Sequence, residues 1–402
     1  MAAGVIPDLG ALAERIREAR PRGFVDLYLT RTAEVWWRVA GGVVTARREL
    51  LREGAAVRSA GTFRSSDGLD RLVLADLLGI TARTLPALAP APFPPPPDIG
   101  PLAAELGATG YELHWRGGWA VLLADGRETP LRRPELLEVL GPDGQRFLYS
   151  WPLAPGWSAP QPAPAPAGPV RPGHPTVLLA PAPAAVLFHE LLAHPLEGDL
   201  LVRGSSPLAG RQGARLFPIP VDVDDDPTAA SLPGSFSADD EGVAARRRLL
   251  VRDGVLVGML CDRASAIALG GKPGNARRAT VHTPPRPRVS NLVIRCRRGD
   301  ADALRREAAV EVTSLASGSV EPRLGLVTLA VRSAWALRRG ARVQPLAPFV
   351  LAGTIADVLG GVRALAGPSV ATAEPGWCSK DGEIVPTGAI APFVLLAGVE
   401  AR

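Results

Sequence analysis

Lysine and asparagine are nearly absent from this 402-residue sequence, in which almost every positive charge is arginine. Only Lys272, Asn275, Asn291 and Lys380 carry these side chains, and all four lie in short glycine- and proline-rich stretches of the C-terminal half. The net charge of +5 is modest for the length, and the arginine clusters lack interleaved aromatic residues. A nucleic-acid-binding surface is therefore not expected. The four scarce residues are present either by chance or for their chemistry, and composition leaves both explanations open.

Cysteine and long apolar runs are also scarce. Three cysteines are too few for a disulfide framework and indicate a reducing compartment. The N-terminal segment has charges throughout and no apolar core typical of a signal peptide, and no run of about 18 apolar residues predicts a membrane span. We therefore expect a cytoplasmic protein that does not bind membranes.

The chain is rich in turn formers, with 43 glycines and 41 prolines, and its apolar residues favour short strands over helices. We predict an α+β fold in three parts. Residues 1–90 form an N-terminal α/β domain with helices on a sheet, and residues 91–175 form a proline-rich middle region or linker. Residues 176–402 form a mostly antiparallel, barrel-like β domain that carries the functional helix.

The stretch HELLAHPLEGD, residues 189–199, contains most of the candidate chemistry. Histidines four apart on an α-helix can share one metal ion, but His189 and His194 are five apart and would point about 140° away from each other. A local π-turn would bring them back into line, so metal binding requires a distorted helix here. Glu190 would then stand beside the metal as a general base, with Glu197 and Asp199 as outer-shell groups. The alternative is an ordinary, partly buried helix with hydrogen-bonded histidines.

Several further motifs follow in order, and together they resemble the TldD branch of the TldD/PmbA metallopeptidases. The first segment is similar to the family's H-E-A-V-G-H-G-L-E-G-D motif, with Ala193 and Pro195 in place of two glycines. The resemblance is strong over residues 185–402, fair over 20–85 and poor between 90 and 175. The later matching segments are DDEG (239–242), GNARR (274–278), PRVSN (287–291) and GWCSKDGEIVPTGAIAPFVLL (376–396).

The resemblance implies a cytoplasmic zinc peptidase, with iron as the alternative metal, whose ion is held by His189, His194 and Cys378 while Glu190 acts as the base. Asn275 and Lys380 fall inside family motifs and become candidates for outer-shell or substrate contacts. The family's substrates are short or unfolded peptides, including leaders of modified precursors, bound as extended strands. Its partner is a PmbA/TldE-like subunit, or here a second copy. The second hypothesis is a non-catalytic partner or peptide-binding scaffold of the same family.

Overall fold

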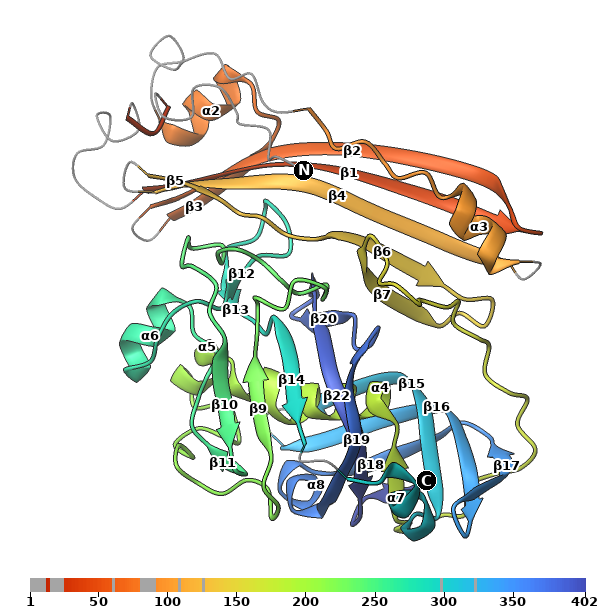
Figure 1. The fold of residues 1–402 in the computed structure, drawn as a ribbon. Coiled ribbons are helices and arrows are strands. Elements are labelled where there is room, and N and C mark those ends of the chain that lie inside the picture. Colours follow the sequence, from red (N-terminus) through yellow and green to blue (C-terminus); the bar gives the residue numbers. More distant parts are fainter. Residues whose placement is uncertain are drawn as a thin grey trace.

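A computed structural model describes residues 12–14, 25–59, 62–79, 92–107, 110–124, 127–296, 299–321 and 324–402. The described strands fall mainly into two sheets, which form the long upper layer and the lower body in Figure 1. The upper sheet is antiparallel throughout, with the strand order β3-β2-β1-β4-β6-β7 and β5 paired to β4. Its strands are β1 (Val25–Ala40), β2 (Val43–Ser59), β3 (Thr62–Asp67), β4 (Tyr111–Ala124), β5 (Arg127–Pro130), β6 (Glu135–Leu140) and β7 (Arg146–Trp151).

The two faces of the upper sheet have different tasks. Because successive side chains of a strand alternate between faces, Leu27 and Leu29 pack beneath helix α2 (Arg71–Leu78), whereas Tyr28 points toward the lower body. Helix α3 (Gly100–Leu106) covers the other end of the helical face, against Val35 and Trp115. Helices on a sheet were predicted here. The helical spacing of apolar residues also predicts a helix over residues 8–22, which lie mostly outside the described residues; 12–14 are described and are helical.

The upper sheet does not end where the proline-rich stretch suggested. Strand β4, within the predicted middle region 91–175, pairs with β1, and β5, β6 and β7 extend the same sheet from β4 as far as Trp151. The physical reason is a long-range pairing, for example of Val35 with Trp115, which no local pattern reveals. The segment from about 152 to 176 runs as an irregular connection down to the lower body (Figure 1).

The lower body holds a 12-stranded sheet with the path β11-β10-β9-β14-β22-β8-β15-β16-β18-β23, to which β17 and β19 attach. All its pairs are antiparallel except β14 with β22 and β15 with β8. The strands are β8 (Val177–Leu179), β9 (Asp222–Asp225), β10 (Arg248–Arg252), β11 (Val255–Leu256), β14 (Asn291–Arg295), β15 (Val310–Glu321), β16 (Leu326–Arg338), β17 (Ala341–Leu346), β18 (Phe349–Thr354), β19 (Val362–Thr372), β22 (Gly388–Leu396) and β23 (Glu400–Ala401).

The barrel-like closure predicted for this region is wrong. Among the described strands the end members β11 and β23 do not pair, whereas a barrel requires its first and last strands to close on each other. Helix α4 (Pro181–Phe188) instead packs against β15, β19 and β22, so a helix rather than closing strands fills the interior. The mixed, strand-rich class is as predicted.

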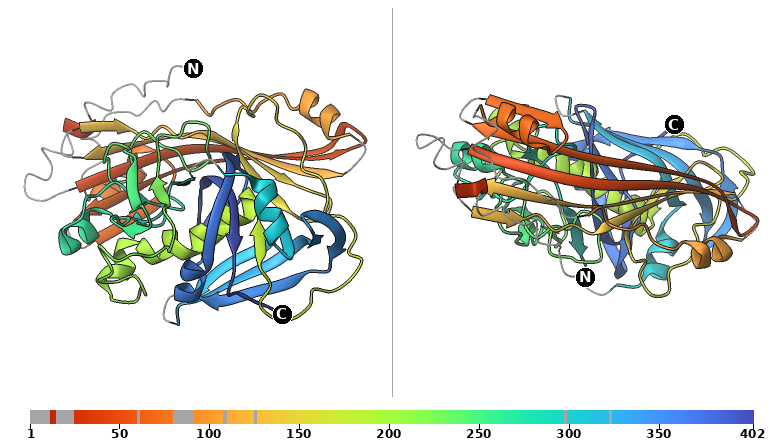
Figure 2. Two further views of the ribbon diagram at one scale, coloured as in Figure 1. Left: turned by 60° about the horizontal axis from the view of Figure 1, so that its bottom comes forward. Right: turned by 90° about the horizontal axis from the view of Figure 1, so that it is seen from above.

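The remaining elements are short and lie around this core (Figures 1 and 2). Two small hairpins, β12 (Ala276–Arg277) with β13 (Arg286–Pro287) and β20 (Trp377–Lys380) with β21 (Glu383–Pro386), reach up toward the upper sheet. The other helices are α5 (Gly198–Val202), α6 (Arg263–Leu269), α7 (Ala301–Glu307) and α8 (Ile355–Gly361). Within the described residues, every helix is too short or too polar to pass through a bilayer.

Candidate metal centre

The helix that carries the two histidines changes its winding where the motif begins. Helix α4 is α-helical up to Phe188, a π-helical turn spans His189–Ala193, and a 3₁₀ turn spans His194–Leu196. The wider π-turn compensates for the five-residue spacing, so the two imidazole rings lie with centroids 4.9 Å apart at an interplanar angle of 85°. Pro195 has no backbone N–H to continue the pattern, which fits the change of winding at this point. The distorted helix that metal binding requires is therefore present.

The β20–β21 hairpin brings Cys378 to the histidines. Asp381 and Gly382, both with positive φ (51° and 79°), form its two-residue turn. Alternation along β20 places Cys378 and Lys380 on the buried side and Ser379 on the exposed side. The hairpin thus places Cys378 beside the histidines, almost two hundred positions away in the sequence, and the same strand also directs Lys380 to this site.

His189, His194 and Cys378 form a compact set of electron-pair donors. One donor atom from each lies within 4.8 Å of the others, and Cys378 Sγ is 3.8 Å from His194 Nε2. Donors bound to one tetrahedral zinc ion are roughly 3.3–3.8 Å apart, so small adjustments would suffice. Both ring nitrogens of His189 are buried without a hydrogen-bond partner. A metal ion would satisfy one of them, and the donor set therefore fits zinc.

The charges within the cluster favour the ligand form of the cysteine. Burial by itself would raise the pKa of the Cys378 thiol, but the neighbouring His194 and His189 outweigh burial and hold that pKa well below its usual value. Burial opposes the charged form of His194 as well, yet Cys378 and Glu197 keep its pKa well above the ordinary value. A thiolate at this position is the state that binds metal.

Glu197 fixes the orientation of His194, as an outer-shell group would. Its fully buried carboxylate lies 3.5 Å from His194 Nδ1, which leaves Nε2 directed toward Cys378. The other carboxylate oxygen is 2.8 Å from Lys380 Nζ, which also contacts Asp199 at 2.7 Å. The structure therefore brings the predicted Glu197, Asp199 and Lys380 together behind the ligands.

Arg288 belongs to this network but was not a candidate from the sequence. Its Nε is 3.6 Å from Glu197, and its Nη2 donates a hydrogen bond to the backbone oxygen of Cys378. The available signal was the PRVSN motif, in which Arg288 is the only long polar side chain. Asn275 does not line the cleft. It is buried behind Arg288, donating to Asp225 at 2.6 Å and accepting the Arg288 backbone N–H at 2.9 Å.

Glu190 differs from Glu197, because within the described residues no lysine or arginine side chain forms an ion pair with it. Its carboxyl group accepts no hydrogen bond within the described residues, and burial raises the pKa of that group. It borders a cleft of about 460 Å³ that is also lined by His189 and His194. The other residues lining this cleft are Glu197, Leu200, Gly318, Ser319, Val320, Trp377, Ser379, Lys380 and Asp381.

The fold and this cluster define a mixed α/β protein with a buried site of two histidines and one cysteine suited to a metal ion. The chain belongs to the PmbA/TldD family, because the model of the PmbA/TldA metallopeptidase C-terminal domain matches residues 172–401. That range includes every candidate ligand, and the resemblance drawn from the motifs is confirmed.

Individual relatives agree with this assignment. A metalloprotease of Archaeoglobus fulgidus is 31% identical over 225 residues, covering 56% of this chain and 52% of the relative. A TldD-homologue metalloprotease of Haemophilus influenzae is 30% identical over 217 residues, covering 53% and 45%. The match thus spans about half the length of these relatives. The crystal structure of TldE from Thermococcus kodakarensis shares the fold over 98% of this chain and all of its own, with a TM-score of 0.69 at 15% identity.

Proposed function

We propose that this chain is a metal-dependent peptidase in which His189, His194 and Cys378 hold zinc, with iron as the alternative. The observation that carries the proposal is the convergence of three donor atoms within 4.8 Å at a π-turn, beside a buried carboxylate in a cleft. The names of the relatives support the same class of activity. Three protein ligands leave a position for water and substrate, as in catalytic zinc sites.

Each residue would have a defined task in hydrolysis. A bound metal would supply Lewis acidity, lowering the pKa of a water and polarising a peptide carbonyl. Glu190 would accept the proton from the attacking water and deliver it to the leaving nitrogen, a role for which a carboxyl group of raised pKa is suited. Glu197 would keep His194 in the tautomer that presents Nε2, and Lys380 and Arg288 would hold Glu197 in place.

We propose an extended peptide as the substrate, and strand β15 supplies the reason. Its first residues pair with β8 on one edge, but from residue 313 onward that edge has no strand partner among the described residues. Gly318, Ser319 and Val320 of this stretch border the metal cleft. A short or unfolded peptide could add there as a further strand through backbone hydrogen bonds, which explains low dependence on side chains. Precursor leader peptides are one such class.

A TldE-like subunit or a second copy of this chain is the proposed partner. Two observations support this partner: the chain shares its fold with TldE, and the cleft is bordered by the edge of β15, which a partner could cover. A reducing compartment such as the cytoplasm would keep Cys378 available as a thiolate, since all three cysteines are free.

The decisive test is metal content followed by peptide cleavage. We expect the purified chain, supplied with zinc, to hold about one zinc ion. His189→Ala and Cys378→Ser should lose it, whereas Cys261→Ser, which removes an equally buried cysteine outside the cluster, should retain it. The zinc-loaded chain, alone or with a TldE-like subunit, should cleave unstructured peptides.

Two results would count against the proposal. If both ligand variants retained zinc, His189 and Cys378 would not be metal ligands, whatever the peptidase activity. Zinc bound as expected, but no cleavage of any peptide with or without the partner, would favour the non-catalytic scaffold.

A further inference from the structure

A small cavity of about 160 Å³ lies between the upper sheet and the loops of the lower body. Strands β1 and β4 form one wall, and the segment 277–281 forms another. Strand β21 contributes Ile384 and Pro386, so the hairpin that carries Cys378 borders both this cavity and the metal cleft. Thr280 and Ile384 are exposed and mark its connection to solvent.

Two adjacent arginines that line the cavity are almost completely buried. Arg277 is 6% exposed and Arg278 is 5% exposed. Arg277 donates one hydrogen bond, from Nη1 to the backbone oxygen of Val289 at 2.6 Å. The Nε and Nη1 atoms of Arg278 have no hydrogen-bond acceptor at all. The Tyr28 ring lies 4.1 Å from its guanidinium carbon and covers one face, but it offers the N–H groups no in-plane acceptor.

The carboxylate nearest these arginines is already engaged. Asp240 forms an ion pair with Arg133, which lines the same cavity, and accepts a hydrogen bond from the backbone N–H of Arg278 at 2.8 Å. Among the described residues, neither Arg277 nor Arg278 forms an ion pair with a carboxylate. Burial together with Arg133 lowers the pKa of Arg277 to about 10. A buried charge without a partner is unfavourable, so a bound anion that balances these arginines would stabilise the native state.

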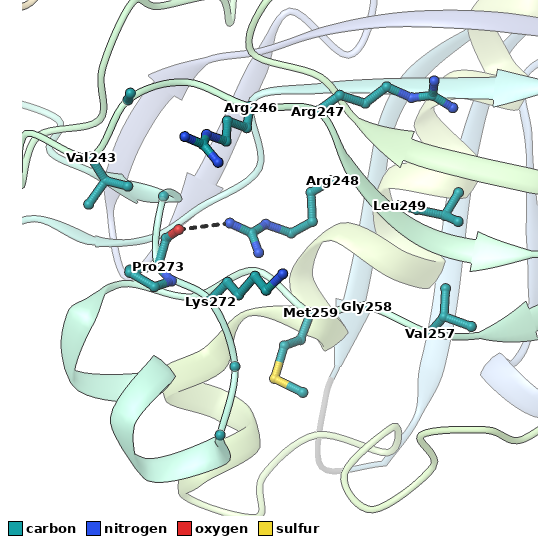
Figure 3. A pocket seen from close by; sticks show the side chains of 14 residues that line it. Val243, Arg246, Arg247, Arg248, Leu249, Val257, Gly258, Met259, Lys272 and Pro273 are labelled. Carbon is teal, nitrogen blue, oxygen red and sulfur yellow. Dashed lines mark hydrogen bonds between the residues drawn. The ribbon is translucent and has the colours of Figure 1, made fainter.

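A second hollow lined by basic side chains differs from this cavity in the exposure of its charges. Arg246, Arg248 and Lys272 border a larger open hollow beside Pro273 (Figure 3). Arg246 and Lys272 are exposed, and water solvates their charges. These groups need no bound counter-ion, and they provide matched controls for the buried pair.

We propose that the cavity between the sheets is a binding site for an oxyanion, a carboxylate or phosphate group, held by Arg277 and Arg278. Planar guanidinium groups bind such oxyanions through parallel hydrogen bonds, and the buried setting strengthens each of them. A bound anion would connect strand β1 to the segment that follows β12. This site is independent of the proposed peptidase activity, because it requires neither metal nor cleavage.

The test is anion-dependent stability of the full chain. Unfolding is followed in inorganic phosphate and in chloride of equal ionic strength, and again with an N-acetylated dipeptide that ends in a free carboxylate or in an amide. We expect phosphate, the free carboxylate or both to raise the unfolding temperature of the wild type, since a ligand that binds only the native state stabilises it. Phosphate alone would indicate a free anion, and the carboxylate but not the amide would indicate the end of a peptide.

The variants locate the effect. Arg278→Met should be at least as stable as wild type in chloride, because it removes an unpaired buried charge, and should lose the response to anions. Arg278→Lys, which keeps the charge but not the planar fork, should bind at least about 10-fold more weakly by calorimetry. Arg246→Met should respond as wild type does, and so should His189→Ala, which removes a metal ligand. No response in wild type, or an unchanged response in both Arg278 variants, would overturn the proposal.

Discussion

The two glutamates that flank His194 in the sequence are both buried, yet the structure holds them in opposite ways. Glu197 is fixed by Lys380 and Arg288 on one side and by His194 on the other. Glu190 forms no ion pair with a lysine or arginine in the part of the chain that the structure describes, and it borders the open cleft next to β15. The first arrangement gives a carboxylate that positions its neighbours. In the proposed mechanism, the second gives one that accepts and releases a proton.

The difference teaches how one short motif separates two roles. Two carboxyl groups of the same chemistry can take different roles when their environments differ. Five residues of π-helix and one 3₁₀ turn place Glu190 and Glu197 in those environments although only six residues separate them in the chain. If the two glutamates have different roles, replacing each of them by glutamine should affect different properties of the protein.

The largest effect is expected from Glu190→Gln. The amide keeps the shape but cannot accept a proton, so kcat for peptide cleavage should fall by roughly 10²–10⁴-fold, equivalent to about 3–5 kcal/mol in the activation barrier. Zinc content should stay at the wild-type level, because Glu190 is not among the three donors. Steady-state kinetics on zinc-loaded protein provide the measurement. Equal activity of the variant and the wild type would remove Glu190 from the mechanism.

Glu197→Gln should act on stability and metal binding instead. It leaves Lys380 and Arg288 buried without their shared carboxylate, and loss of one partner of a buried ion pair costs about 3–5 kcal/mol of unfolding free energy. Zinc affinity should drop by about 10–100-fold as His194 loses its support. Urea unfolding and competition with a zinc chelator measure the two effects.

Asp199→Asn is the matched control for this substitution. Asp199 shares Lys380 with Glu197, but its side chain is 28% exposed and also pairs with exposed Arg203. Its replacement should therefore cost clearly less stability and leave zinc affinity close to wild type. Equal losses in both variants would mean that Glu197 acts only as one more charge near the lysine.

A third buried glutamate, Glu374, lies outside the metal centre and should make the stability of the fold depend on pH. Its carboxyl group accepts a hydrogen bond from Gln145 Nε2 at 2.6 Å, and burial raises its pKa from 4.5 to about 7. The native state then keeps a proton that the unfolded chain releases, so this group's stabilising contribution is complete below pH 4.5 and is lost as pH rises to about 7. The loss amounts to at most about 3 kcal/mol.

Glu374→Gln should remove this slope. The difference in unfolding free energy between variant and wild type, measured in urea from pH 5 to 8, should shift in favour of the variant as pH rises. Exposed Glu307→Gln should show no such shift. A pH-independent difference for Glu374→Gln would show that the carboxyl group ionises normally in the native state.

Local geometry explains which parts of this site were predictable. The spacing of His189 and His194 predicts a π-turn if both bind one metal ion, and this inference needs only a few consecutive residues. Cys378 became a candidate ligand only through the family resemblance, although the alternation that places it and Lys380 on one side of β20 is local.

The parts that were not predictable depend on distant pairing. Arg288 reaches Glu197 only because β13 lies beside the site, and Trp377 donates a hydrogen bond at 2.9 Å to Glu138 of the upper sheet. The pairing of β1 with β4 is also distant in sequence. Because of it, the upper sheet continues past residue 90, where we predicted the N-terminal domain to end, to about residue 151. Open or closed sheets have the same alternation of apolar residues, so the absent barrel closure had no local signal.

Gly318→Ala should give the smallest effect and tests the open side of the comparison directly. A Cβ atom at this position of β15 would lie 2.6 Å from Val186 and 3.1 Å from Glu190 Cγ, closer than carbon atoms pack. Overpacking of this kind costs about 1–3 kcal/mol of unfolding free energy, and the relaxation would displace Glu190. We expect lower kcat at unchanged zinc content, measured beside Gly360→Ala in α8, whose added Cβ meets no atom within 4 Å. If Gly318→Ala lost stability but kept full kcat, the close approach of β15 would not be what positions Glu190 for catalysis. Glu190 would then act from more than one position, whereas Glu197 is fixed by its ion pairs.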